Sequence, residues 1–212
     1  MSNKSNIDDK GSEERSARYE FRVWGKHRAA RKQLERLATV TVEEEYEDCY
    51  LLVDDPTWNA KVRDNTLKIK HLVAEKKGFE QWASGRYHSA KATPSPFDDL
   101  FDELRLDRPQ RGKKYNLPKE VRSLDQIDGV RAVFVSKNRR RYTIGDLRAE
   151  VTDIEIHDSG EKLRTLSIQG DDLKELRRLR KRLGLGDEPN VAMHQHIDAE
   201  TAPELSAPKK KA

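Results

Sequence analysis

Residues 59–72, which read NAKVRDNTLKIKHL, constrain the fold of this chain more than any other stretch. Two short runs, 60–63 and 66–72, flank Asp64 and Asn65. Both of these residues tolerate the positive φ angles that a tight hairpin turn requires. The sequence therefore predicts a two-stranded antiparallel hairpin with a two-residue loop.

Four basic side chains of this hairpin are predicted to share one face. Counting back from the loop pairs Lys61 with Lys68, and side chains alternate along a strand. Like charges directly opposite each other cost about 0.2–1 kcal/mol per pair, a cost that an anion held among them would offset. The alternative is an exposed, lysine-rich edge hairpin that resists aggregation. The cationic face consists of Lys61, Arg63, Lys68 and Lys70, and the apolar face of Val62, Leu67 and Ile69.

A second cationic strand is predicted over residues 130–142, VRAVFVSKNRRRY. Alternation places Val133 and Val135 on the same face as Lys137, Arg139 and Arg141. An exposed strand has no obvious reason to align three cations behind two valines. This pattern favours the anion-binding interpretation of the hairpin.

The remaining chain predicts further strands and a few helices. Period-two patterns predict strands at 18–24, 40–53, 148–157 and 163–169, and helical spacing predicts helices at 26–37 and 173–183. The acidic run 43–45 is expected to be a solvated turn or edge. Residues 88–128 form a long connection with one short predicted helix at 97–106, and the polar segments 1–17 and 198–212 are predicted to be disordered tails.

Composition excludes some classes of site. The 42 Lys+Arg and 38 Asp+Glu residues give a net charge of only +4, so the placement of charge matters more than its sum. The single cysteine, Cys49, permits neither an intrachain disulfide nor a thiolate metal cluster, and is expected to be buried. No apolar run approaches the roughly 18 residues of a membrane span, and no signal-peptide core is recognised. We expect a cytoplasmic protein that is not associated with a membrane.

The order of these segments resembles the CYTH family, also called triphosphate tunnel metalloenzymes. The resemblance rests on a Tyr-Glu strand, a helix, a DCY strand, the KVR and LKIK hairpin, a V-x-K-x-R strand, an AEV strand, an SIQ strand and a leucine-rich helix ending LGL. It implies an α+β fold over residues 18–197, a closed or nearly closed antiparallel β-barrel of about eight strands with flanking helices. Members of the family hydrolyse inorganic, thiamine or RNA triphosphates, or cyclise ATP.

The resemblance also implies a binding site, and this chain matches its basic half. In the family, basic residues in the tunnel bind the triphosphate, and acidic residues hold Mg²⁺ or Mn²⁺. The predicted substrate-binding residues are Arg22, Lys61, Arg63, Lys68, Lys70, Lys137, Arg139 and Arg141.

The acidic half of the site departs from the family. Its E-x-E-x-K strand here reads Glu20, Arg22 and Trp24, and the last strand has Ser167 and Gln169 where members carry Glu. Glu20 and Glu150 remain as the predicted catalytic and metal-binding residues. Because a hard cation needs several oxygen ligands, these replacements are expected to weaken metal binding and strengthen anion capture.

Three functions follow as hypotheses. The first is a metal-dependent phosphohydrolase that acts on an inorganic or organic triphosphate. The alternative is a catalytically weakened module that binds a phosphate anion, a nucleotide or polyphosphate. The third is a nucleic-acid binder in which Trp24 stacks on a base, although Trp24, Trp58 and Trp82 are expected to be packing anchors rather than stacking platforms. His194 and His196 could serve as a pair of metal ligands, but a short His pair in a C-terminal segment is expected to have no such role.

Overall fold

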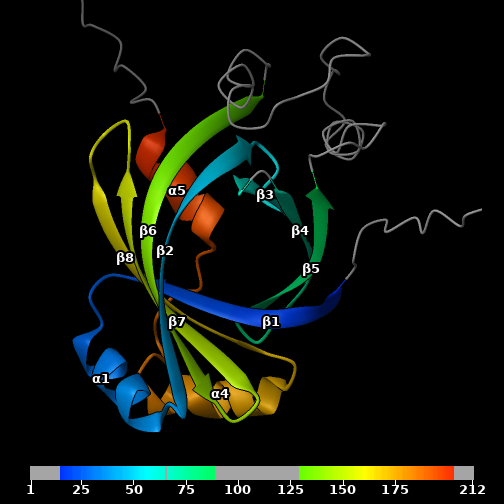
Figure 1. Ribbon diagram of the computed structural model, residues 1–212. Helices are drawn as coiled ribbons and strands as arrows, with labels where there is room; N and C mark the ends of the chain where they lie inside the picture. Colours follow the sequence, from blue (N-terminus) through cyan, green and yellow to red (C-terminus); the bar gives the residue numbers. More distant parts are fainter. Residues whose placement is uncertain (1–14, 65, 89–128, 203–212) are drawn as a thin grey trace, which may run out of the picture.

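Eight strands form the body of the protein in the computed structural model, which describes residues 15–64, 66–88 and 129–202. They close into one antiparallel barrel in the order β1-β5-β4-β3-β2-β6-β7-β8 (Figure 1). An eight-stranded barrel has an interior just wide enough for side chains or one small ligand. The strands are β1 (Arg15–Trp24), β2 (Val40–Val53), β3 (Trp58–Arg63), β4 (Thr66–Lys76), β5 (Phe79–His88), β6 (Val130–Ile144), β7 (Leu147–Ile156) and β8 (Lys162–Gly170).

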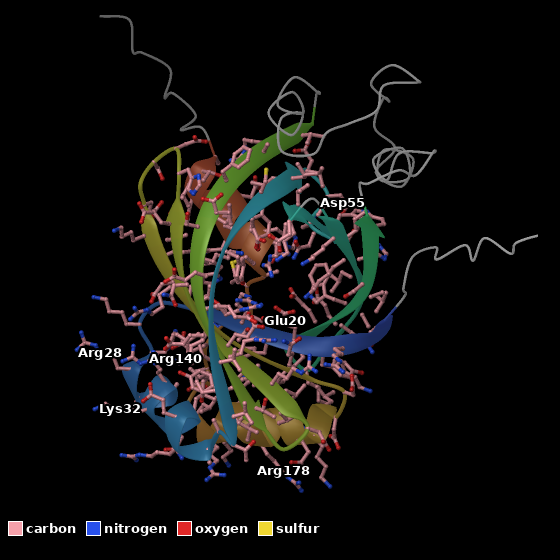
Figure 2. All side chains as sticks on the ribbon, viewed as in Figure 1. Glu20, Arg28, Lys32, Asp55, Arg140 and Arg178 are labelled. Atoms are coloured by element: carbon pink, nitrogen blue, oxygen red, sulfur yellow. The ribbon has the colours of Figure 1, made fainter. Side chains whose placement is uncertain are left out.

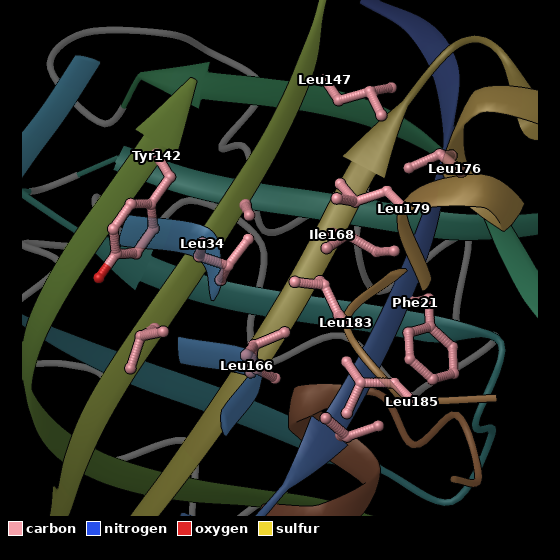
Figure 3. Packing of buried hydrophobic residues seen from close by; sticks show 14 of the residues in the cluster. Phe21, Leu34, Tyr142, Leu147, Leu166, Ile168, Leu176, Leu179, Leu183 and Leu185 are labelled. Atoms are coloured by element: carbon pink, nitrogen blue, oxygen red, sulfur yellow. The ribbon is translucent and has the colours of Figure 1, made fainter. Parts of the chain in front are cut away.

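Two helices cover the outside of the barrel at one end. They are α1 (Arg28–Leu37) and α4 (Leu173–Arg182) (Figure 1). Leu34 of α1 and Leu176 of α4 are fully buried against Phe21 and Ile168 of the sheet (Figure 3). Asp172 caps α4 by accepting hydrogen bonds from two backbone amides, at 2.7 and 3.0 Å. This core holds one side of the sheet rigid and leaves the other face of each strand for the barrel interior.

A third helix, α5 (Met193–Thr201), closes the opposite end (Figure 1). Its Met193 and Ile197 pack against Tyr50, Val135 and Ile154 in a second apolar cluster. Alternation puts these strand residues on the same faces as the basic side chains of β6 and the polar ones of β2. The barrel interior is therefore apolar at the α5 end and charged further along.

The predicted fold class and hairpin are confirmed. The structure is a closed antiparallel barrel with flanking helices, and β3 pairs with β4 in the register obtained by counting from the loop, with Lys61 opposite Lys68. Asp64 adopts the positive φ expected of a turn residue, 49°. Because β3 and β4 each have a neighbour on both sides, the hairpin is not the exposed edge of the alternative interpretation.

The prediction of a turn or edge at residues 43–45 was wrong. This acidic run lies inside the continuous strand β2, in register with β6, where Glu43 pairs with Arg140 and Glu44 with Arg139. Opposite charges facing each other across two strands stabilise this pairing. An acidic run can therefore continue a strand when a basic run 95 or more residues away pairs with it.

Other differences lie at element boundaries. β1 begins at Arg15, within the segment predicted to be an N-terminal tail, and α5 continues to Thr201, within the predicted C-terminal tail. Strand β5 was not predicted, and its Trp82 was expected only to pack. The short helix predicted at 97–106 lies outside the described residues, as does nearly all of the connection 88–128. No helix in the described ranges is long and apolar enough to cross a membrane.

Candidate functional site

Three of the predicted basic residues converge on one buried carboxylate, Asp48. Arg63 binds it from Nε at 2.5 Å and from Nη2 at 2.7 Å. Lys61 donates to it at 3.1 Å and Lys137 at 2.9 Å, and Lys137 also donates to the Tyr50 hydroxyl at 2.6 Å. The strands β3, β2 and β6 are consecutive in the barrel, so residues far apart in the sequence meet here.

Burial and charge act against each other within this cluster. Burial alone would raise the pKa of Asp48, but the charges of Lys61 and Lys137 and the hydrogen bond from Arg63 outweigh it and hold that pKa well below its usual value. Burial lowers the pKa of Lys137 to about 8, although the charge of Asp48 opposes the shift. Burial likewise lowers the pKa of Lys61. The cluster therefore holds cations whose charged form would be favoured further by an anion.

A second cluster surrounds Glu20, which lies among the side chains inside the barrel (Figure 2). Glu20 accepts a hydrogen bond from Arg22 at 2.8 Å and another from Lys70 at 2.9 Å. Burial would raise the pKa of Glu20, but the charges of Lys70 and Arg22 lower it well below the usual range. Both carboxylate oxygens of Glu20 are thus committed to cations.

A third cluster joins β6 to β2 and β7. Arg139 contacts Glu150 at 3.3 Å and also binds Glu44, and Arg141 binds Glu44 at 2.6 Å. Two guanidinium groups lie over the ring of Tyr46, that of Arg63 at 3.6 Å and that of Arg139 at 4.8 Å from the ring centroid. Cations stacked on an aromatic face in this way are oriented as well as attracted.

The barrel thus collects the predicted basic residues from four strands. Lys61, Arg63 and Lys137 surround Asp48, and Arg22 and Lys70 surround Glu20. Arg139 and Arg141 bind Glu44, and Lys68 is half-buried opposite Lys61. That these residues bind a substrate stays a prediction.

Asp48 and Glu44 were not predicted from the sequence as residues of the site. A period-two signal shows that Glu43, Glu45 and Glu47 share a face, and that Glu44 and Asp48 share the other, but not which face is inside. The basic strand 130–142 could have indicated that carboxylates such as Asp48 and Glu44 face inward, because buried cations require buried carboxylates nearby.

A cavity of about 330 Å³ opens beside Glu20. Lys70, Arg18 and Arg148 line it, together with Gln169 and the neighbouring Trp82 and Ser84. Because Glu20 and Lys70 both line it, the cavity adjoins the Glu20 cluster. A larger hollow of about 800 Å³ lies mostly over outward-facing residues such as Glu45, Glu47, Asp153 and Glu155. Its lining also contains Lys26, Lys137, Lys162 and Arg164, so its acidic and basic residues are equal in number.

Glu20 and Glu150, the predicted metal ligands, do not form a typical site for Mg²⁺ or Mn²⁺. The described part of the chain contains no group of three or more His, Cys, Asp or Glu residues that could hold a metal ion. Both oxygens of Glu20 bind cations, and Glu150 contacts Arg139. Hard divalent ions require several oxygen ligands, which this donor set does not supply. Dependence on Mg²⁺ or Mn²⁺ stays a prediction.

Trp24 and the two histidines serve packing. Trp24 donates from Nε1 to the carbonyl of Val191 at 3.0 Å and stacks on His196, with ring centroids 3.7 Å apart. His194 is buried and hydrogen-bonds the carbonyl of Pro56 at 3.0 Å. These contacts fix α5 and the segment before it to the barrel, so Trp24 is not presented as a platform for a base.

The comparisons with known proteins bear on the fold. No family model and no curated protein matches the sequence. The PH1012 protein from Pyrococcus horikoshii OT3 has 18% identity and a TM-score of 0.53, over 85% of this chain and 98% of that one. A conserved hypothetical protein from Pyrococcus furiosus has 17% identity and a TM-score of 0.47, over 84% and 99%. The Pct1 RNA triphosphatase of S. pombe has 10% identity and a TM-score of 0.32, over 84% and 78%.

These likenesses concern architecture alone. The match to PH1012 covers almost the whole of that chain and 85% of this one, including its closed antiparallel barrel. At 18% identity, the likeness to PH1012 shows that the two chains share a fold.

Proposed function

We propose that this protein binds a triphosphate-containing small molecule or a polyphosphate inside its barrel. One observation carries the proposal: basic side chains from β1, β3, β4 and β6 gather in one barrel with fewer carboxylates. Phosphate oxygens are best bound by several convergent N–H donors, and Arg supplies two in a fork. The cations are Arg22, Lys61, Arg63, Lys70, Lys137, Arg139 and Arg141, and the carboxylates Glu20, Glu44, Asp48 and Glu150.

The excess of positive charge supports a polyanion rather than a single phosphate. The seven cations exceed the four carboxylates by three charges, or by two when the buried Glu80 opposite Glu20 is counted as ionised. Uncompensated charge in a partly buried site is costly, and a chain of phosphates relieves this cost at several points. The three clusters also lie on adjoining strands, which suits an extended ligand.

Ion pairs inside the barrel support binding in a second way. Asp48 fixes Lys61, Arg63 and Lys137 before any ligand arrives. Immobilising a long side chain on binding costs about 0.5–1.5 kcal/mol, and side chains that are already ordered avoid much of this cost.

Isothermal titration with tripolyphosphate tests the proposal. Arg139→Gln removes one charged donor, worth about 1.5–3 kcal/mol, and should weaken binding by roughly 10- to 150-fold. Arg164→Gln is the matched control, because Arg164 pairs with Asp153 on the outer face at 2.8 Å. Binding should also weaken as salt rises. Equal affinities of the two variants, or no binding by the parent protein, would reject the proposal.

Metal-dependent hydrolysis of a triphosphate is the second candidate. It is favoured by the presence of two carboxylates, Glu20 and Glu150, in the same charged interior as the proposed phosphate ligands. The test is phosphate release from tripolyphosphate or ATP with Mg²⁺ or Mn²⁺, using protein shown to be folded. An absence of turnover with both metals, in a protein that still binds tripolyphosphate, leaves a binding module.

A further inference from the structure

Arg22 is a buried cation placed between the two carboxylates that were predicted to hold a metal. Its side chain is 7% exposed and binds Glu20 at 2.8 Å. Across the sheet, Arg22 of β1 pairs with Ser167 of β8, and Ser167 pairs with Glu150 of β7. Arg22 and Glu150 therefore lie in one row, and the charges of both carboxylates raise the pKa of Arg22 against the effect of burial.

Arg22 also has hydrogen-bonding capacity that the described residues do not satisfy. Its Nε atom is buried and has no hydrogen-bond partner among them, and its Nη1 contact to the Thr165 hydroxyl is long, at 3.4 Å. Buried donors almost always have partners, so an unpartnered one requires an explanation. Because Arg22 is two residues from Glu20 on the same strand face, this donor belongs to the barrel interior, where an acceptor on a ligand would complete it.

We infer that Arg22 is the resident cation of the barrel, and that phosphate binding here needs no divalent metal ion. Together with Lys70 at Glu20 and Arg139 at Glu150, the guanidinium offsets the charge of both carboxylates, which leaves little net negative charge to attract Mg²⁺ or Mn²⁺. It is also charged at every accessible pH and offers its Nε–H to a phosphate oxygen. This inference rests on the proposed function, because it explains how the proposed phosphate site binds its ligand without a metal ion.

Two measurements on the parent protein test the inference. The first is titration with tripolyphosphate in EDTA and again with Mg²⁺. Binding in EDTA should be at least as tight, because Mg²⁺ neutralises part of the ligand's charge. The second is the electron paramagnetic resonance signal of Mn²⁺ mixed with the protein without phosphate, which should stay that of the unbound ion.

Arg22→Glu should reverse both properties. It removes the cation and places a third carboxylate near Glu20 and Glu150. Binding of tripolyphosphate in EDTA should weaken at least tenfold, or about 1.4 kcal/mol, and the unbound Mn²⁺ signal should fall on addition of the variant. Arg164→Glu makes the same change of charge on the outer face, beside Asp153, and should show neither effect.

The outcomes separate this inference from the proposed function. Binding of tripolyphosphate only with metal would leave the proposed function standing and overturn the inference. Tight Mn²⁺ binding by the parent protein, or an Arg22→Glu variant that binds tripolyphosphate undiminished in EDTA, would also overturn it. No binding under any condition would overturn both. If Arg22→Glu does not fold, the two measurements on the parent protein still decide.

Discussion

Replacing Asp48 by Asn should destabilise the fold much more than its small change in size suggests. The Asp48 side chain is completely buried and is the common partner of Lys61, Arg63 and Lys137. Asn keeps the shape but removes the charge, so three cations remain without their shared counter-ion. Breaking a buried ion pair by removing one partner typically costs about 3–5 kcal/mol.

The structure places the expected cost near the lower end of this range, at about 3 kcal/mol. Lys61 and Arg63 are 21% and 12% exposed, so water can compensate part of their loss. Lys137 is only 2% exposed but retains the Tyr50 hydroxyl. Because the folded-state pKa of Asp48 lies below its usual 3.8, this stabilisation is present above pH ~4 and is lost as pH falls through the folded-state pKa.

Urea denaturation at pH 7 measures the free energy of unfolding of the parent and the variant. Asp153→Asn is the matched control: Asp153 pairs with Arg164 on the outer face, where such pairs contribute at most about 1 kcal/mol. Tripolyphosphate at about 100 times its dissociation constant should restore roughly 2.7 kcal/mol to Asp48→Asn. A cost for Asp48→Asn no greater than that for Asp153→Asn would refute the view that Asp48 organises the cationic cluster.

Three further predictions concern other parts of the barrel. The pKa of Lys137 is about 8 in the folded state and 10.5 ordinarily, so between these pH values the folded state binds fewer protons than the unfolded state. The free energy of unfolding, measured by urea denaturation, should therefore rise with pH from about 8 to 10.5 through this group. Ile197→Ala, at a fully buried position of α5, should cost about 2–5 kcal/mol and lower the Tm. Gly170→Ala would place a Cβ 2.6 Å from the Leu147 side chain; it should cost about 1 kcal/mol in the same assay, because the end of Leu147 can shift.

Each of these predictions has a control or an outcome that would contradict it. Lys137→Met should flatten the rise in stability between pH 8 and 10.5, and an unchanged slope would contradict the assignment to Lys137. Gly186→Ala introduces a Cβ that meets nothing within 4 Å, so it should leave stability nearly unchanged. If Ile197→Ala melts with the parent protein, α5 does not hold the end of the barrel closed.

The hairpin and the second cationic strand could be predicted because their signals are local. Two turn residues fix the register of β3 and β4, and alternation along β6 assigns Lys137, Arg139 and Arg141 to one face. Alternation is a property of the extended backbone and needs no knowledge of distant neighbours. The same reasoning failed for β2, where acidic residues on both faces gave no indication of which side is the interior.

α5 could not be predicted from its own residues. It is short, and isolated helices of this length are marginal in water, so packing must stabilise it. Ile197 and Met193 supply that packing at the end of the barrel, and His196 stacks on Trp24, a residue 172 positions earlier. The sequence alone does not show that the end of the barrel offers an apolar surface on which this helix can pack.

The sequence by itself determined most of the strands, the turn of the hairpin and which side chains carry positive charge. Only the tertiary structure decided how that charge is balanced. Asp48 and Lys137 are 89 residues apart, and Glu44 and Arg139 are 95 apart. Each pair meets because barrel closure makes β2 and β6 neighbours, and no local preference of either segment specifies that contact.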